Sequence, residues 1–239
     1  MMGNWGKDVK ASTRHAVAAL LLAACLPAFA QEKRETVVAV ELVLALDSSA
    51  SVDNAEFLLQ LQGVARAFAD PEVLEAVDRL RPLGAAIAVM QWGGPGESRV
   101  VVPFTHIETG RDAKAYGFMT GLIRRWNRAS TTSIASGISD SQRLLEGNGY
   151  DGYRKVIDVS GDGEDNSDIP LDAARDAARD AGIIINGLAI ESDQKNLTAY
   201  YEKNVIAGPY AFVETANGFE DFARAIKEKL LRELRPPES

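Results

Sequence analysis

The sequence of 239 residues has few of the side chains on which thiol, redox and zinc chemistry depend. It contains one cysteine, Cys25, and two histidines, His15 and His106. A lone cysteine excludes an intramolecular disulfide, and the chain after it has no thiol for nucleophilic catalysis. Oxygen ligands without imidazole or thiolate suit Mg²⁺, Ca²⁺ and Mn²⁺, and they suit zinc and copper poorly. Oxygen-based metal sites are therefore the metal chemistry that this composition favours.

Long apolar runs are also missing. The best candidate lies near the start, where three basic residues precede the apolar segment 16–26, which is too short to span a bilayer as a helix. Ala28-Phe29-Ala30 then forms a small-x-small cleavage site. We therefore predict a signal peptide over 1–30, a short leader over 31–35, and export to the periplasm or the cell exterior without a transmembrane helix.

A second interpretation of the same segment stays open. Leu22-Ala23-Ala24-Cys25 resembles the lipobox of bacterial lipoproteins, which would make Cys25 a lipid anchor. Either way the exported chain is acidic, because the net charge of −8 becomes −10 once residues 1–30, with three basic residues and one acidic residue, are removed. That charge argues against nucleic acid and anionic membrane as partners.

From residue 36 to residue 234, short apolar runs alternate with amphipathic helical stretches, and residues 235–239 form a polar tail. This alternation predicts one α/β domain, a doubly wound, mostly parallel six-stranded sheet with helices on both faces. The predicted strands cover 36–46, 84–92, 99–104, 155–160, 183–190 and 209–214. The predicted helices cover 53–69, 71–80, 111–126, a segment ending at 145, one starting at 170, 197–206 and 218–234. The short turn 93–96 predicts that the third strand is an antiparallel edge.

Oxygen-bearing side chains follow two of the buried strands. Asp47, Ser49 and Ser51 leave the first strand, and alternate residues on an extended chain point the same way. Asp162 follows the fourth strand. We expect these two strands to be neighbours at the switch point of the sheet, so that their loops share one crevice. Ser51 has an alternative role, since it or Asp53 can cap the next helix.

A third polar loop, 130–132, precedes a helix, and the three loops together resemble the metal-ion-dependent adhesion site of von Willebrand factor A-type domains. That motif reads D-x-S-x-S, a threonine before a helix, and an aspartate after the fourth strand. The resemblance places metal ligands at Asp47, Ser49, Ser51, Thr132 and Asp162, with Thr131 as ligand if the register slips by one. It covers 36–234 and points to a bacterial exported branch of unassigned function. Gly161 departs from it, because the general pattern has threonine there.

The resemblance implies a protein-binding, adhesion or scaffold module and no enzyme. The implied ion is Mg²⁺, and Mn²⁺ or Ca²⁺ could take its place. Neutral hydroxyl ligands leave most of the positive charge of such an ion uncompensated. An Asp or Glu side chain of another protein then completes the coordination. The alternative is a metal-dependent hydrolase acting on a phosphoester or ester. His106, the one histidine after the leader, follows the edge strand, which argues against a serine–histidine pair.

Overall fold

The computed structural model describes residues 35–126 and 130–235, and its central element is the buried strand β2 (Val40–Asp47). All eight of its residues are buried, because helices cover both faces of the sheet in which it lies. The predicted signal peptide, the start of the leader and the polar tail after residue 235 lie outside the described residues.

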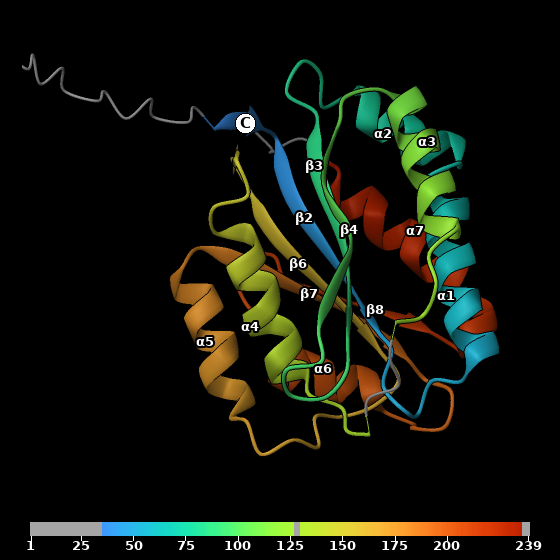
Figure 1. Cartoon of the computed structure of the whole chain (residues 1–239), viewed down its shortest axis with the longest axis vertical. Coiled ribbons are helices and arrows are strands. Elements are labelled where there is room, and N and C mark those ends of the chain that lie inside the picture. Colours follow the sequence, from blue (N-terminus) through green and yellow to red (C-terminus); the bar gives the residue numbers. More distant parts are fainter. Residues whose placement is uncertain (1–34, 127–129, 236–239) are drawn as a thin grey trace, which may run out of the picture. The chain divides into compact units, whose positions relative to one another are not determined.

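The sheet has six strands (Figure 1). In spatial order they are β4 (Arg99–Ile107), β3 (Ala85–Trp92), β2, β6 (Lys155–Gly161), β7 (Ile183–Ile190) and β8 (Val213–Ala216). Every pair is parallel except β3 with β4, which are antiparallel. The predicted doubly wound sheet with one antiparallel edge strand is confirmed. The predicted contact between the first and fourth strands is the pairing of β2 with β6.

Helices cover the sheet on two sides (Figure 1). One layer contains α1 (Asn54–Ala67), α2 (Pro71–Asp78), α3 (Gly110–Gly121) and α7 (Phe222–Glu233), which follows the short 3-10 helix η1 (Phe219–Asp221). It packs on Leu42, Leu44 and Leu46 of β2. The other layer contains α4 (Ile134–Leu145), α5 (Leu171–Asp180) and α6 (Leu197–Asn204), and it packs on Val43 and Ala45. Alternate residues of one strand thus serve two cores.

The first predicted strand is two strands in the structure. Ala39 interrupts it, and β1 (Thr36–Val38) pairs in parallel with β5 (Tyr150–Gly152) as a separate two-stranded sheet. None of the predicted strands includes residues 150–152, so β5 is a correction. The buried carboxylate of Glu41 holds this connection, because its Oε1 accepts a hydrogen bond from the backbone N–H of Gly152 (2.7 Å).

Two further boundaries differ from the prediction. Helix α3 ends at Gly121, well before residue 126, because the side-chain amide of Gln91 bonds the backbone of the following segment. Gln91 donates to the Arg124 carbonyl (2.9 Å) and accepts from the Trp126 N–H (2.8 Å). The last strand is Val213–Ala216 and not 209–214, because the Phe212 N–H bonds the Asn186 side chain and the paired residues of β7 and β8 begin at Val213.

Candidate metal site

The carboxyl ends of β2 and β6 form the switch point of the sheet. The chain proceeds from β2 outward to β3 and β4 on one side, and from β6 outward to β7 and β8 on the other. Asp47 is the last residue of β2, and Asp162 directly follows β6. In open α/β sheets this crevice is where ligands bind.

Asp47 is fully buried, and only one of its two carboxylate oxygens accepts a hydrogen bond from the described residues. Its Oδ1 accepts a hydrogen bond from the Ser49 backbone N–H (2.7 Å), while its Oδ2 has no hydrogen-bond partner among the described residues. Gln60 holds the end of the strand by donating from Nε2 to the Asp47 carbonyl (3.1 Å). Burial, followed by the nearby charge of Asp162, raises the pKa of Asp47 to about 7. A cation beside Oδ2 would offset both the cost of burying a charged carboxylate and its repulsion by Asp162.

A chain of hydroxyls joins the first loop to Asp162. The Oγ atoms of Ser49 and Ser51 lie 3.0 Å apart, and Ser51 Oγ donates to Asp162 Oδ1 (2.8 Å) across 111 residues of sequence. Asp162 is 9% exposed, and burial raises its pKa as well. The structure therefore brings together four of the five predicted ligands: Asp47, Ser49, Ser51 and Asp162.

Asp53, and not Ser51, caps the start of helix α1. Its Oδ1 accepts from the N–H groups of Ala55 (2.6 Å) and Glu56 (2.9 Å), and the Glu56 side chain bonds back to the Asp53 N–H (2.6 Å). This capping box satisfies the start of α1 without help from Ser51. The Ser51 hydroxyl is thereby left to the crevice.

Thr132, the fifth predicted ligand, is buried and is tied to the loop that carries Asp162. Its N–H donates to Asn166 Oδ1 (2.8 Å), and its carbonyl accepts from the Asn166 N–H (3.0 Å). Ser133, not residues 130–132, caps α4. Thr131 Oγ1 lies close to Gly94, where an added Cβ would be 2.6 Å from it. No described hydrogen bond joins Thr132 to the other four residues, so its role as a ligand stays a prediction.

Arg125 is a residue of this site that the sequence did not reveal. Its Nη1 donates to the Val52 carbonyl (2.7 Å), and its Nη2 donates to the carbonyls of Ser48 (2.7 Å) and Ser49 (2.6 Å). The guanidinium also lies 5.5 Å from the centre of the Phe57 ring. One side chain thus fixes the backbone of the loop that carries Ser49 and Ser51. Nothing in the sequence marks it, because it falls in the stretch predicted as helix.

Tyr201 occupies the space left by Gly161. A Cβ on Gly161 would lie 2.7 Å from Tyr201 Oη and 3.0 Å from Asp47 Oδ2. The Tyr201 hydroxyl is buried, and it has no hydrogen-bond partner among the described residues. A phenol therefore stands beside Asp47 where the general adhesion-site pattern has a threonine. The departure at Gly161 was the available signal, although the sequence did not say which side chain fills the gap.

The donor set is compatible with a hard cation. It consists of two carboxylates and three hydroxyl-bearing residues, with no nitrogen or sulfur ligand, which suits Mg²⁺, Mn²⁺ or Ca²⁺. Among the described residues no group of three or more His, Cys, Asp or Glu is placed to hold a metal ion. The candidate site has three hydroxyl-bearing residues and only two carboxylates, so it does not belong to that class of metal site. The buried, unpartnered Asp47 Oδ2 is the observation in favour of a cation.

Comparison with known proteins agrees with this fold. A family model described as "Protein of unknown function (DUF1194)" matches residues 37–238. The chain belongs to this family. A search of curated proteins finds no match. No helix in the described part of this DUF1194 protein has the length and apolarity needed to cross a membrane.

Solved structures similar to this DUF1194 protein include von Willebrand factor A domains. Proximal thread matrix protein 1 from the mussel byssus has a TM-score of 0.62 at 16% identity, covering 83% of this chain and 48% of that one. A von Willebrand factor type A protein from Catenulispora acidiphila has a TM-score of 0.58 at 17% sequence identity, and the match covers 82% of this chain and 43% of that one. The pilus adhesin SpaC from Lactobacillus rhamnosus GG has a TM-score of 0.58 at 14% sequence identity, and the match covers 84% of this chain and 31% of that one. The DUF1194 chain thus spans less than half the length of these proteins, and it has a von Willebrand factor A-like fold.

Proposed function

We propose that this chain is an exported, divalent-cation-dependent protein-binding module of the adhesion or scaffold type. The observation that carries the proposal is the buried Asp47 Oδ2, which has no hydrogen-bond partner among the described residues. Burial and then the nearby charge of Asp162 raise the pKa of this carboxyl. A buried carboxylate oxygen without a donor is costly, and a bound cation offsets that cost. Asp47, Ser49, Ser51, Thr132 and Asp162 are the residues proposed to hold it.

The chemistry of these residues suits capture of an acidic side chain. A bound Mg²⁺ would supply a hard Lewis-acidic charge for which the three hydroxyl-bearing residues provide neutral ligands. Asp47 is held in place by the Ser49 N–H and Asp162 by the Ser51 hydroxyl, so the two carboxylates are oriented before any ligand arrives. Such preorganisation lowers the entropic cost of binding. An Asp or Glu of a partner protein is the ligand class that this arrangement favours.

Known proteins support the adhesive interpretation. One of the solved similar structures is a pilus adhesin, and a crystal form of the byssus protein is described as having a zinc-occupied MIDAS motif, the acronym for the metal-ion-dependent adhesion site. Identities of 14–16% make this support for the class of site and not for a shared partner. For the present chain Mg²⁺ is the proposed ion, with Mn²⁺ or Ca²⁺ as substitutes.

The geometry offers little to a hydrolase. His106 lies near the end of β4, where its Nε2 is 2.9 Å from the Leu83 carbonyl oxygen. Its partner in the sheet is Ala86, at the start of β3, whereas the candidate site follows the ends of the parallel strands. Within residues 35–126 and 130–235 the hydroxyls of Ser49 and Ser51 therefore have no imidazole base within reach, and we propose a binding function without catalysis.

The test is thermal unfolding of the purified protein in EDTA, in Mg²⁺ and in Mn²⁺. An ion present at a hundred times its Kd stabilises the folded state by about 2.7 kcal/mol. For a domain of this size we expect a rise in Tm of about 5–10 °C. Asp47→Asn should abolish the rise, while Asp176→Asn on the surface of α5 should retain it. Equal melting temperatures for the wild-type protein in EDTA and in both cations would exclude the metal site.

The partner and the cellular location need their own experiments. Affinity capture from the native cell, with and without EDTA, should retain a protein only while the cation is present. Capture by the Asp47→Asn protein as well would contradict the proposal. The mass of the mature N-terminus distinguishes cleavage after Ala30 from lipidation at Cys25. A full-length, unmodified protein in the cytoplasm would exclude both cleavage after Ala30 and lipidation at Cys25.

A further inference from the structure

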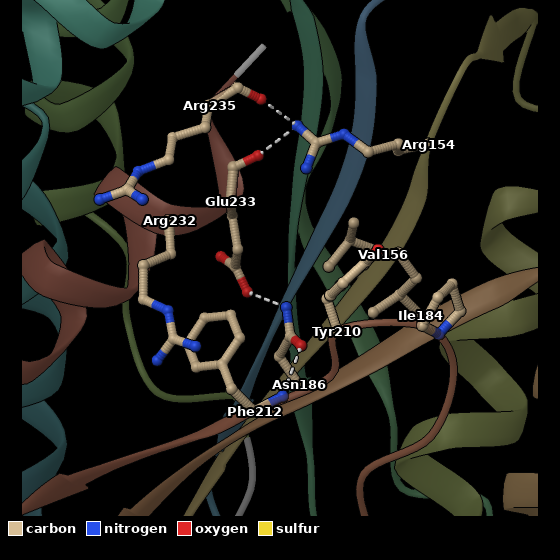
Figure 2. A pocket seen from close by; sticks show the side chains of 10 residues that line it. Arg154, Val156, Ile184, Asn186, Tyr210, Phe212, Arg232, Glu233 and Arg235 are labelled. Carbon is tan, nitrogen blue, oxygen red and sulfur yellow. Dashed lines mark hydrogen bonds between the residues drawn. The ribbon is translucent and has the colours of Figure 1, made fainter. Parts of the chain in front are cut away.

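A cavity of about 200 Å³ lies at the opposite end of the sheet from the candidate metal site (Figure 2). Its apolar wall includes Val156 and Ile184, which are paired near the starts of β6 and β7. Three arginines line it: Arg154 from the residue before β6, and Arg232 and Arg235 from the end of α7. We propose that this cavity binds a small ligand through a carboxylate or phosphate group.

Arg154 is built into the cavity wall. Its Nη2 donates to the carbonyls of Glu233 and Arg235, both at 2.7 Å, and so holds the end of α7 (Figure 2). Its Nε–H is buried without an acceptor in the described part of the chain. Burial also lowers the pKa of the Arg154 guanidinium, the direction expected when a cation is poorly compensated. An anion in the cavity would add the negative charge that this guanidinium lacks.

The other two arginines add charge that the described residues do not neutralise. Neither Arg232 nor Arg235 has a carboxylate partner there. Arg232 lies flat against the Phe212 ring, with its guanidinium carbon 3.3 Å from the ring centre (Figure 2). Stacking of this kind fixes the orientation of the guanidinium while its N–H groups stay free for a planar anion.

The one carboxylate on the wall has a buried cation beside one of its oxygens, while Glu233 Oε2 has no hydrogen-bond partner among the described residues. Glu233 Oε1 accepts from Lys229 Nζ (2.6 Å) and from Asn186 Nδ2 (2.9 Å), and both Glu233 and Lys229 are buried. Lys229 Nζ is also paired with Asp158 Oδ1 at 3.0 Å. The net charge around the cavity is therefore positive, although the chain as a whole carries −8. An anion is the ligand that this local field selects.

The size of the cavity limits the ligand. Pockets for drug-sized molecules usually enclose roughly 300–1,000 Å³, so a volume of about 200 Å³ fits an anionic group with a short apolar body. Val156, Ile184 and Phe212 supply the apolar surface for that body. Tyr210 stands at the rim, 97% exposed, with a φ of 59° that places it in the left-handed region. A protein or nucleic acid would be too large to enter.

Titration calorimetry with inorganic phosphate and with butyrate, at an ionic strength matched by NaCl, tests the proposal in the presence of EDTA. We expect saturable binding of at least one anion, with amide shifts in the NMR spectrum at Ile184 and Phe212. Arg232→Gln should raise the Kd about tenfold, the factor for one lost charge-assisted hydrogen bond. Arg66→Gln, which removes an exposed charge from α1, is the matched control and should leave the Kd unchanged.

Each outcome bears on the proposal. Binding of phosphate alone assigns a phosphate ligand, and binding of butyrate alone assigns a carboxylate. Arg154→Lys keeps the charge but removes the Nε–H, so it should also weaken binding if that donor contacts the anion. An absence of saturable binding, or an equal loss in Arg232→Gln and Arg66→Gln, would overturn the proposal. Circular dichroism of each variant separates weaker binding from loss of the fold.

Discussion

The close approach of Tyr201 to Gly161 predicts a specific energetic coupling between the two positions. A Cβ on Gly161 would lie 2.7 Å from Tyr201 Oη, closer than real Cβ contacts come. The backbone of Gly161 is not in the left-handed region, so the cost of Gly161→Ala is steric and not conformational. Overpacking of this kind typically costs about 1–3 kcal/mol. We expect Gly161→Ala to lower the free energy of unfolding by about that amount.

Removing the hydroxyl should relieve the clash. Tyr201 Oη is buried without a hydrogen-bond partner among the described residues, so Tyr201→Phe by itself should leave stability unchanged or raise it by up to about 1 kcal/mol. In the double variant the Cβ of Ala meets no hydroxyl, and only the contacts with Asp47 Oδ2 (3.0 Å) and Trp92 Cζ2 (3.3 Å) stay tight. The coupling energy of the cycle should therefore be about 1 kcal/mol or more.

Gly187 provides the matched control for this cycle. A Cβ at that position would lie 2.7 Å from Tyr201 Cδ1, a ring carbon that phenylalanine keeps. Gly187→Ala should destabilise in either background. Urea unfolding in EDTA, where no metal contributes, measures all five variants against the wild type, and the midpoints are comparable if the m-values agree. Equal costs of Gly161→Ala with and without Tyr201→Phe would refute the assignment of the Tyr201 hydroxyl to this space.

Three further predictions follow from buried and clamped charges. Lys229→Met should cost about 3–5 kcal/mol in urea unfolding at pH 8, because it leaves two buried carboxylates unpaired. The exposed control Lys114→Met should stay within about 0.5 kcal/mol. Burial raises the pKa of Asp158 from 3.8 to about 7, so stability should fall as the pH rises through that window, and Asp158→Asn should flatten the slope. Arg125→Gln should weaken Mn²⁺ binding about tenfold in calorimetry, whereas Arg124→Gln should not.

The sheet and most of the candidate site were predictable because they depend on local pattern. The first and fourth strands are apolar almost throughout, which marks both as central, and central parallel strands present their carboxyl ends side by side. Asp47 and Asp162 follow directly from that placement. The capping box at Asp53 was equally local, since it needs only Asp53 and Glu56, and it frees Ser51 for the crevice.

The parts that escaped prediction depend on side chains from distant elements. The stretch after Gly121 reads as helix, but its backbone bonds the amide of Gln91, 35 residues before Trp126, in place of continuing the helix. Asp158 is paired with Lys229, 71 residues later, on a helix whose register no strand pattern specifies. Arg125 enters the site through the same irregular segment. Tertiary hydrogen bonds override local propensity at each of these points, and a single sequence does not record them.

The candidate metal site and the arginine-lined cavity lie at opposite ends of the central strands. Two carboxylates whose pKa values are raised stand at the carboxyl ends of β2 and β6, and three arginines surround the start of β6. The distance from Val156 to Asp162 is six residues of strand, or about 20 Å. At an effective dielectric constant of about 20, two unit charges so far apart interact by less than about 1 kcal/mol, and physiological salt reduces this further. Electrostatics alone therefore leaves the two ends nearly independent, so a cation bound at one end would change the affinity for an anion at the other by only a small factor.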